Sequence, residues 1–211
     1  MSKRPYHHGN LRPALIEAAL QLAAERGPLG VTLREAARRA GVSHAAPYRH
    51  FPDKEGLLAA AATVGFEQLA VALDEETAGK EPGSALMATG RAYVRFALQH
   101  PGRFTVMFGP SVGDRSQHEA LVAAEERTYS LLCERVDGAM RAGVIAVGDV
   151  DRVALTLWST MHGLAALVSS GGFARRGLDA ESVEGLAVDV GRQLFAGLHG
   201  KEQQGPDGGA R

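Results

Sequence analysis

Apolar residues recur every three or four positions along most of the chain, which is the spacing of one face of an α-helix. No run of alternating β-branched residues bounded by turns is present. The pattern therefore predicts an all-α protein. A first helix is expected to follow Asn10 and to end at Gly27-Pro28, and a long one to follow Asp53 and run through Leu73. Further helices are predicted over residues 33–40, 84–99, 101–108, 115–142, 149–170 and 179–198.

Two short helices are expected between the long ones. Thr32 and Glu35 match a capping box, in which a hydroxyl and a carboxylate satisfy free backbone donors reciprocally. Gly41 then turns the chain, and Ser43 is a suitable N-cap for a second helix of seven or eight residues. Pro47 would lie near its first turn, where the missing N–H costs at most about one hydrogen bond. The spacing predicts a helix-turn-helix.

The composition is that of a soluble globular protein, with 45% hydrophobic and 22% charged residues in 211. Neither a membrane-spanning stretch of about 20 apolar residues nor a signal-peptide pattern is evident, so a cytoplasmic protein is expected. A single cysteine, Cys133, excludes an internal disulfide.

Charge is distributed unevenly along the chain. Residues 1–56 carry nine lysines and arginines and five acids, whereas the whole chain has a net charge of −1. The N-terminal part is therefore +4 and the remainder −5. A cationic head on an acidic body is typical of a protein that binds a polyanion.

The second short helix has suitable chemistry for DNA. If Val42 and Phe51 bracket it against a small core, its exposed residues are His44, Ala45, Tyr48 and Arg49. Small side chains let a helix enter the major groove, and the others can donate hydrogen bonds to bases or phosphates.

The segment VTLREAARRAGVSHAAPYRHFPDKEGLL resembles the DNA-binding domain of the TetR family of bacterial transcriptional regulators, and the similarity extends over about residues 8–66. The resemblance implies a three-helix DNA-binding domain over 1–56, a larger helical bundle for ligand binding and dimerisation over 57–199, and a disordered tail over 200–211. Base contacts are implied for Arg34, His44, Ala45 and Ala46, and phosphate contacts for Thr32, Tyr48, His50 and Lys54; the interface also includes Ser43 and Arg49. Pro47 stands where the family commonly has leucine and should face the small core.

In the body, TLWSTMHGLAAL and HPGRFTVMF resemble a TetR subgroup with a Trp…His-Gly signature. This resemblance implies a homodimer formed through the last two helices, which reads a palindromic operator and responds to a small-molecule effector. An apolar or aromatic ligand is expected, with its polar group held by Tyr129 or His162. The expected lining residues are Tyr93, Phe96, Phe104, Met107, Phe108, Tyr129, Trp158, Met161 and His162.

Three alternatives remain at this level. A metal-responsive regulator would use His100, His118, His162 and Cys133, whose spacing matches no standard site. An enzyme is disfavoured because no Glu-x-x-His pair, HExxH motif or glycine-rich phosphate loop is present, and no cofactor is expected. A protein that has lost DNA binding is disfavoured by the presence of His44, Tyr48 and Lys54.

Overall fold

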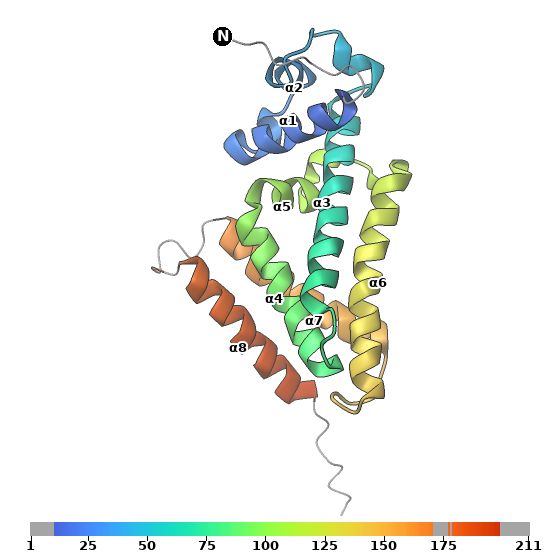
Figure 1. The fold of residues 1–211 in the computed structure, drawn as a ribbon, viewed down its shortest axis with the longest axis vertical. Coiled ribbons are helices and arrows are strands. Elements are labelled where there is room, and N and C mark those ends of the chain that lie inside the picture. Colours follow the sequence, from blue (N-terminus) through green and yellow to red (C-terminus); the bar gives the residue numbers. More distant parts are fainter. Residues whose placement is uncertain (1–10, 171–176, 178, 199–211) are drawn as a thin grey trace, which may run out of the picture. The chain divides into compact units, whose positions relative to one another are not determined.

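The computed structural model describes residues 11–170, 177 and 179–198, and all regular structure in these residues is helical (Figure 1). The predicted all-α class is confirmed. The α-helices are α1 (Leu11–Arg26), α2 (Leu33–Arg39), α3 (Lys54–Thr77), α4 (Pro82–Gln99), α5 (Pro101–Phe108), α6 (Glu119–Arg141), α7 (Val150–Ser169) and α8 (Ala180–Leu198). Short 3-10 helices are η2 (Pro28–Gly30), η3 (Ala46–Arg49), η4 (Pro110–Val112) and η5 (Arg115–Gln117). The predicted cap Asn10 and the predicted tail lie outside the described residues.

Most predicted helix ends agree with the structure within two residues, but the helix predicted over 115–142 was wrong at its start. Asp114 accepts a hydrogen bond from the Ser116 N–H and opens the separate 3-10 helix η5. The carbonyl of His118 then accepts from the N–H groups of Leu121 and Val122, which starts α6. Competition from this local side-chain bond explains the late start.

The chain forms two compact units. The first contains residues up to 71 and 96–128, and the second contains 72–95 and the chain from Tyr129 onward. The division falls inside α3, which runs without a break from Lys54 to Thr77. The predicted boundary at residue 56 therefore remains a prediction.

In the first unit, α1 packs against α2 and α5. Leu15, Leu22 and Leu57 are fully buried. A Cβ on Gly102 of α5 would lie 2.6 Å from the Ala24 Cβ of α1, so these helices approach too closely for any larger residue. The close packing fixes the first helix of the head against α5.

In the second unit, a cluster of buried side chains joins α4, α6 and α7. It consists of Leu86, Val136, Ala139, Met140, Ile145, Ala154 and Leu157. Close helix approach was predicted for the glycines of the last helix, and this is confirmed for Gly191, where a Cβ would lie 2.9 Å from Met87 Cε. It was wrong for Gly185 and Gly197, where a Cβ would meet nothing within 4 Å.

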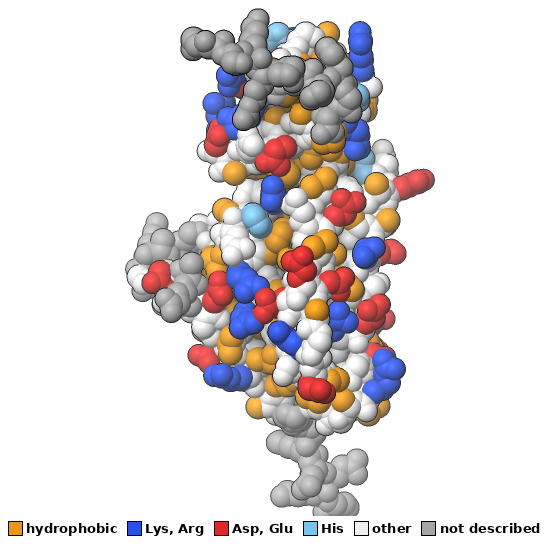
Figure 2. Space-filling view, in the orientation of Figure 1, with side chains coloured by type: hydrophobic (Ala, Val, Ile, Leu, Met, Phe, Trp, Pro, Cys, Tyr) orange, Lys and Arg blue, Asp and Glu red, His pale blue; other side chains and the backbone are white. Residues whose placement is uncertain are grey.

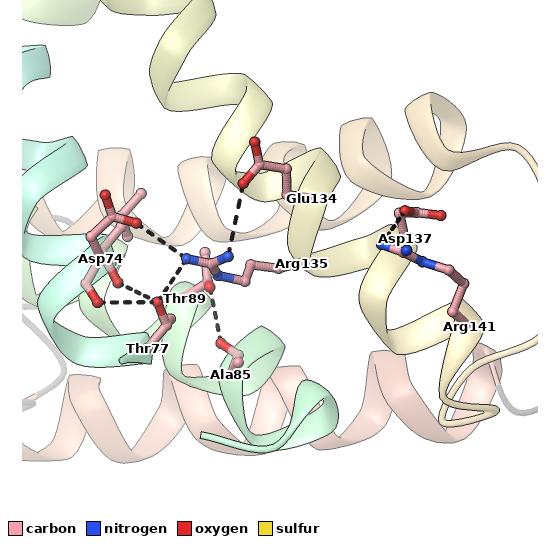
Figure 3. A network of polar contacts seen from close by, with 9 residues as sticks. Asp74, Thr77, Ala85, Thr89, Glu134, Arg135, Asp137 and Arg141 are labelled. Carbon is pink, nitrogen blue, oxygen red and sulfur yellow. Dashed lines mark hydrogen bonds and ion pairs between the residues drawn. The ribbon is translucent and has the colours of Figure 1, made fainter. Parts of the chain in front are cut away.

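Polar contacts join α6 to the end of α3 within the second unit (Figure 3). One Arg135 nitrogen donates to the Asp74 carboxylate and to the Thr77 hydroxyl, each at 3.1 Å. Glu76, on the same stretch of α3, pairs with both Arg91 and Arg95 of α4. These pairs orient the last turns of α3.

One described helix, α3, is long and apolar enough to cross a membrane. More than half of its most apolar window, 56%, is buried inside the protein, as in the core helix of a soluble fold.

Candidate nucleic-acid interface

Local hydrogen bonds set the start and end of α2. The Thr32 hydroxyl accepts from the Glu35 N–H at 3.1 Å, which confirms the predicted N-cap. The Glu35 carboxylate pairs with Arg38 at 3.0 Å, so the second half of the predicted capping box does not form. Gly41 has φ of 71°, a conformation that side chains rarely adopt, and it reverses the chain after α2. The turn predicted there is confirmed.

The second helix of the motif is shorter than predicted. A helix of seven or eight residues capped by Ser43 was wrong, because the structure has only the 3-10 helix η3 over Ala46–Arg49, with Ala45 at its N-cap position. Pro47 has no N–H to donate to the Ser43 carbonyl, and the Ala46 N–H bonds that carbonyl instead at 3.0 Å. The tighter bonding pattern of a 3-10 helix results.

Burial separates an inner and an outer side of this segment. Pro47 and Phe51 are buried, as the sequence predicted for the inward-facing proline. Tyr48 is 54% exposed, and Arg49 and His50 are exposed beside it. The segment therefore presents a surface rich in hydrogen-bond donors, anchored by two apolar side chains.

The predicted DNA-contacting residues differ in exposure. The exposed ones are Thr32, Arg34, Ser43, His44, Ala45, Tyr48, Arg49 and His50, and the half-buried ones are Ala46 and Lys54. The Lys54 ammonium donates to the Leu29 carbonyl at 3.1 Å. Lys54 thus ties the first turn of α3 to η2, a role that its sequence position did not indicate.

The arginines of the head fall into two groups. Arg38 pairs with Glu35 at 3.0 Å and Arg39 with Glu25 at 2.6 Å, and hydrogen bonds from these two arginines lower the pKa values of the carboxyl groups. Arg34 and Arg49 are exposed and have no ion pair within the described part of the chain. In Figure 2, blue Lys and Arg side chains lie on both sides of the part built by α1, α2 and η3. The unpaired arginines retain their full charge for a polyanion.

The geometry agrees with two matches to known families. Residues 15–61 match the model of bacterial regulatory proteins of the tetR family, and residues 86–190 match a tetracyclin repressor-like C-terminal domain. Together these matches cover most of the chain.

The chain belongs to the TetR family of transcriptional regulators.

Relatives of this TetR-family regulator share its length and fold. A solved protein of unknown function from Rhodococcus sp. RHA1 is 35% identical, with a TM-score of 0.78, over 94% of this chain and 100% of that one. The TetR-family regulator PfmR from Thermus thermophilus is 20% identical, with a TM-score of 0.69, over 88% and 99%. The uncharacterized HTH-type transcriptional regulator YobS from Bacillus subtilis is 21% identical over 90% of this chain and 93% of its own. The regulator class is confirmed and an enzyme is not supported, whereas the Trp…His-Gly subgroup remains a prediction.

The predicted ligand-lining residues of the TetR-family regulator form two groups. In the second unit, the Tyr93 hydroxyl lies 2.8 Å from His162 Nδ1 and accepts a hydrogen bond from Trp158 Nε1 at 3.3 Å. Tyr129 stacks edge-on against Trp158, with ring centroids 6.1 Å apart, and Met161 is buried nearby on α7. Burial lowers the pKa of His162 and raises that of Tyr93, so both groups are neutral at pH 7.

The other four residues lie in the first unit. Phe66 contacts Phe108 with centroids 5.1 Å apart, and Phe104 contacts Phe108 at 4.8 Å. Phe96 contacts His100 at 5.0 Å, and Met107 is fully buried against Gly65. These side chains pack as an aromatic layer in the unit that also contains the head.

The histidines and the cysteine considered for a metal site are dispersed. His118 lies 3.6 Å from Glu55 in the first unit, and Cys133 lies 3.7 Å from Asp151 in the second. Among the described residues, no three His, Cys, Asp or Glu side chains come together as a metal site would require.

Proposed function

We propose that this protein is a homodimeric repressor that binds a palindromic operator and is released by a small apolar or aromatic ligand. It acts in the cytoplasm, where its DNA is. Membership of the TetR family establishes DNA-binding regulation, and the proposal adds the operator symmetry, the sign of regulation and the effector class.

The observation that carries the proposal is the outward surface of residues 43–50. Buried Pro47 and Phe51 anchor this segment, while His44, Tyr48 and Arg49 are exposed with Arg34 on the preceding helix. Guanidinium and imidazole groups donate to base edges, and a phenol donates to phosphate. Small residues at 45 and 46 allow the backbone to approach the floor of the groove.

Dimerisation is supported by one face of α7. Its exposed residues cover about a third of the helix circumference and none of them is charged: Leu155, Thr156, Ser159, Gly163, Ala166, Leu167 and Ser170. Leu155 and Leu167 are 48% and 55% exposed. Helix α8 contacts α7 and adds the open Gly185 and Gly197. An uncharged face with small residues suits a second copy of the same helix pair, related by a two-fold axis.

The effector class is supported by the Tyr93–Trp158–His162 group. Three aromatic rings and buried Met161 offer an apolar environment, and the neutral His162 and Tyr93 groups can orient one polar group of a ligand. A ligand releases DNA only if it binds better to the conformation that spaces the two heads wrongly.

The test is selection of binding sites from a random duplex pool at about 150 mM salt, where non-specific phosphate attraction is weakened. An enriched palindrome whose half-sites lie about one helical turn apart, or a longer fixed distance, supports the proposal. Enrichment of a single asymmetric site would contradict the symmetric operator. Absence of enrichment with a folded dimer would contradict sequence-specific binding by the free protein.

A further inference from the structure

Arg12 is attached to the recognition segment by an aromatic ring. Its guanidinium carbon lies 5.4 Å from the centroid of the Phe51 ring, within the range of a cation–π contact. Phe51 directly follows His50 and is only 2% exposed, and its N–H bonds the Pro47 carbonyl at 2.9 Å. The ring therefore fixes Arg12 of α1 beside the end of η3.

The charge of Arg12 is not neutralised by the protein. Four other arginines of the first unit pair with carboxylates: Arg38 with Glu35, Arg39 with Glu25, Arg103 with Glu17, and Arg115 with Glu125. Arg12 is exposed and has neither an ion pair nor a hydrogen bond within the described residues. A cation–π contact uses the face of the guanidinium and leaves its N–H donors at the edge unused.

We propose that Arg12 is an additional DNA-contacting residue, which binds a backbone phosphate next to the bases read by residues 43–49. The inference rests on the proposed function. A phosphate is the expected partner because Arg12 lies on α1, outside the segment that enters the groove, and beside His50, for which a phosphate contact is itself expected. A planar fork held flat on a ring also loses little entropy when it binds two phosphate oxygens.

The test measures affinity for the selected duplex and for a scrambled duplex at several salt concentrations. Arg12→Gln is expected to weaken binding to both duplexes about tenfold and to lower the salt slope by about 0.9 per phosphate released. Arg12→Lys, which keeps the charge, should retain the slope and recover part of the affinity. Arg127→Gln on α6 is the control, since it removes an exposed arginine of the same unit and should change neither quantity.

A second measurement locates the contact without relying on the stability of one variant. Duplexes with single neutral methylphosphonate linkages are scanned for weakened binding by the wild type. One linkage in each half-site should weaken wild-type binding and have no further effect on Arg12→Gln. The same linkage should retain its effect on the control variant Arg127→Gln.

Two results would overturn the assignment. One is an unchanged salt slope in Arg12→Gln, with no linkage whose effect depends on residue 12. The other is a loss confined to the selected duplex, which would make Arg12 a base-reading residue. If the wild type binds neither duplex, the proposed function fails; if it binds both and Arg12→Gln is indistinguishable from it, only the role of Arg12 fails.

Discussion

At the scale of single residues, Pro47 and Phe51 control the surface offered to DNA. Both are buried, and together they hold a four-residue 3-10 helix that could not be stable alone. Their burial leaves Tyr48 and Arg49 on the opposite side. The departure from leucine at position 47 therefore alters the helix type and leaves the exposed side unchanged.

Arg34 and Tyr48 are predicted to act differently on DNA. Arg34→Ala should cost about 1–3 kcal/mol on the preferred operator and relax the preference at one base pair, because an unpaired guanidinium is suited to a base edge. Tyr48→Phe should weaken binding to all duplexes equally, since it removes only a hydroxyl expected on phosphate. Competition binding against single-base operator variants measures both. Equal loss on every sequence for Arg34→Ala would refute base reading by this residue.

The buried contact between Tyr93 and His162 should make stability depend on pH. Burial holds the pKa of folded His162 below its unfolded value of about 6.5, so the unfolded state binds more protons as the pH falls. The stabilising contribution is therefore complete above pH 6.5 and is lost as the pH falls through the folded pKa. Protonation would also force the Tyr93 hydroxyl to stop donating to Nδ1.

The measurement is urea unfolding of the wild type and of His162→Asn between pH 7.5 and 5.5. Asn does not titrate, so the wild type should lose stability over this range relative to the variant. Parallel pH curves for the two proteins would show that His162 does not titrate differently in the folded state.

At the scale of elements, helix ends follow local side chains and helix packing follows small residues. Asp53 caps α3 by accepting from the Gly56 N–H at 2.8 Å, as its position after Pro52 predicted. The contact between α1 and α5 instead depends on Gly102, whose role is visible only when Ala24 is placed against it. Local signals therefore predicted the elements better than their neighbours.

Gly102→Ala should destabilise the protein by about 1–3 kcal/mol, because the new Cβ would lie 2.6 Å from the Ala24 Cβ and α1 would have to move. Gly138→Ala in α6 is the matched control, since a Cβ there meets nothing within 4 Å. It should stabilise the helix by about 0.5–1 kcal/mol. Thermal and urea unfolding check both variants. Similar stabilities for the two would contradict the close packing of α1 on α5.

At the scale of the whole molecule, dimerisation would explain why α7 exposes an uncharged face. Leu167→Glu should raise the dissociation constant of the dimer about 30-fold or more, because it buries a charge at the proposed interface. Val147→Glu is the control, since Val147 is 87% exposed in the loop before α7. Analytical ultracentrifugation measures both. A dimer of unchanged strength in Leu167→Glu would place the interface elsewhere.

The candidate DNA surface was largely predictable from sequence, and the candidate ligand group was not. Residues 32–54 are consecutive, so caps, turn and proline locate them relative to one another. Tyr93 and His162 are 69 positions apart, and their 2.8 Å contact follows from the packing of α4 on α7. Aromatic residues of the body were correctly considered as a set, although their division between two units had no sequence signal.

The sequence by itself determined the all-α class, the positions of most helices, the turn at Gly41 and the family, because these depend on periodicity, capping and motif order over short distances. Tertiary structure decided which arginines keep an unpaired charge, why Lys54 is tied to Leu29, and how Phe51 holds Arg12. Each of these depends on side chains brought together across the chain, and no local pattern specifies such a meeting.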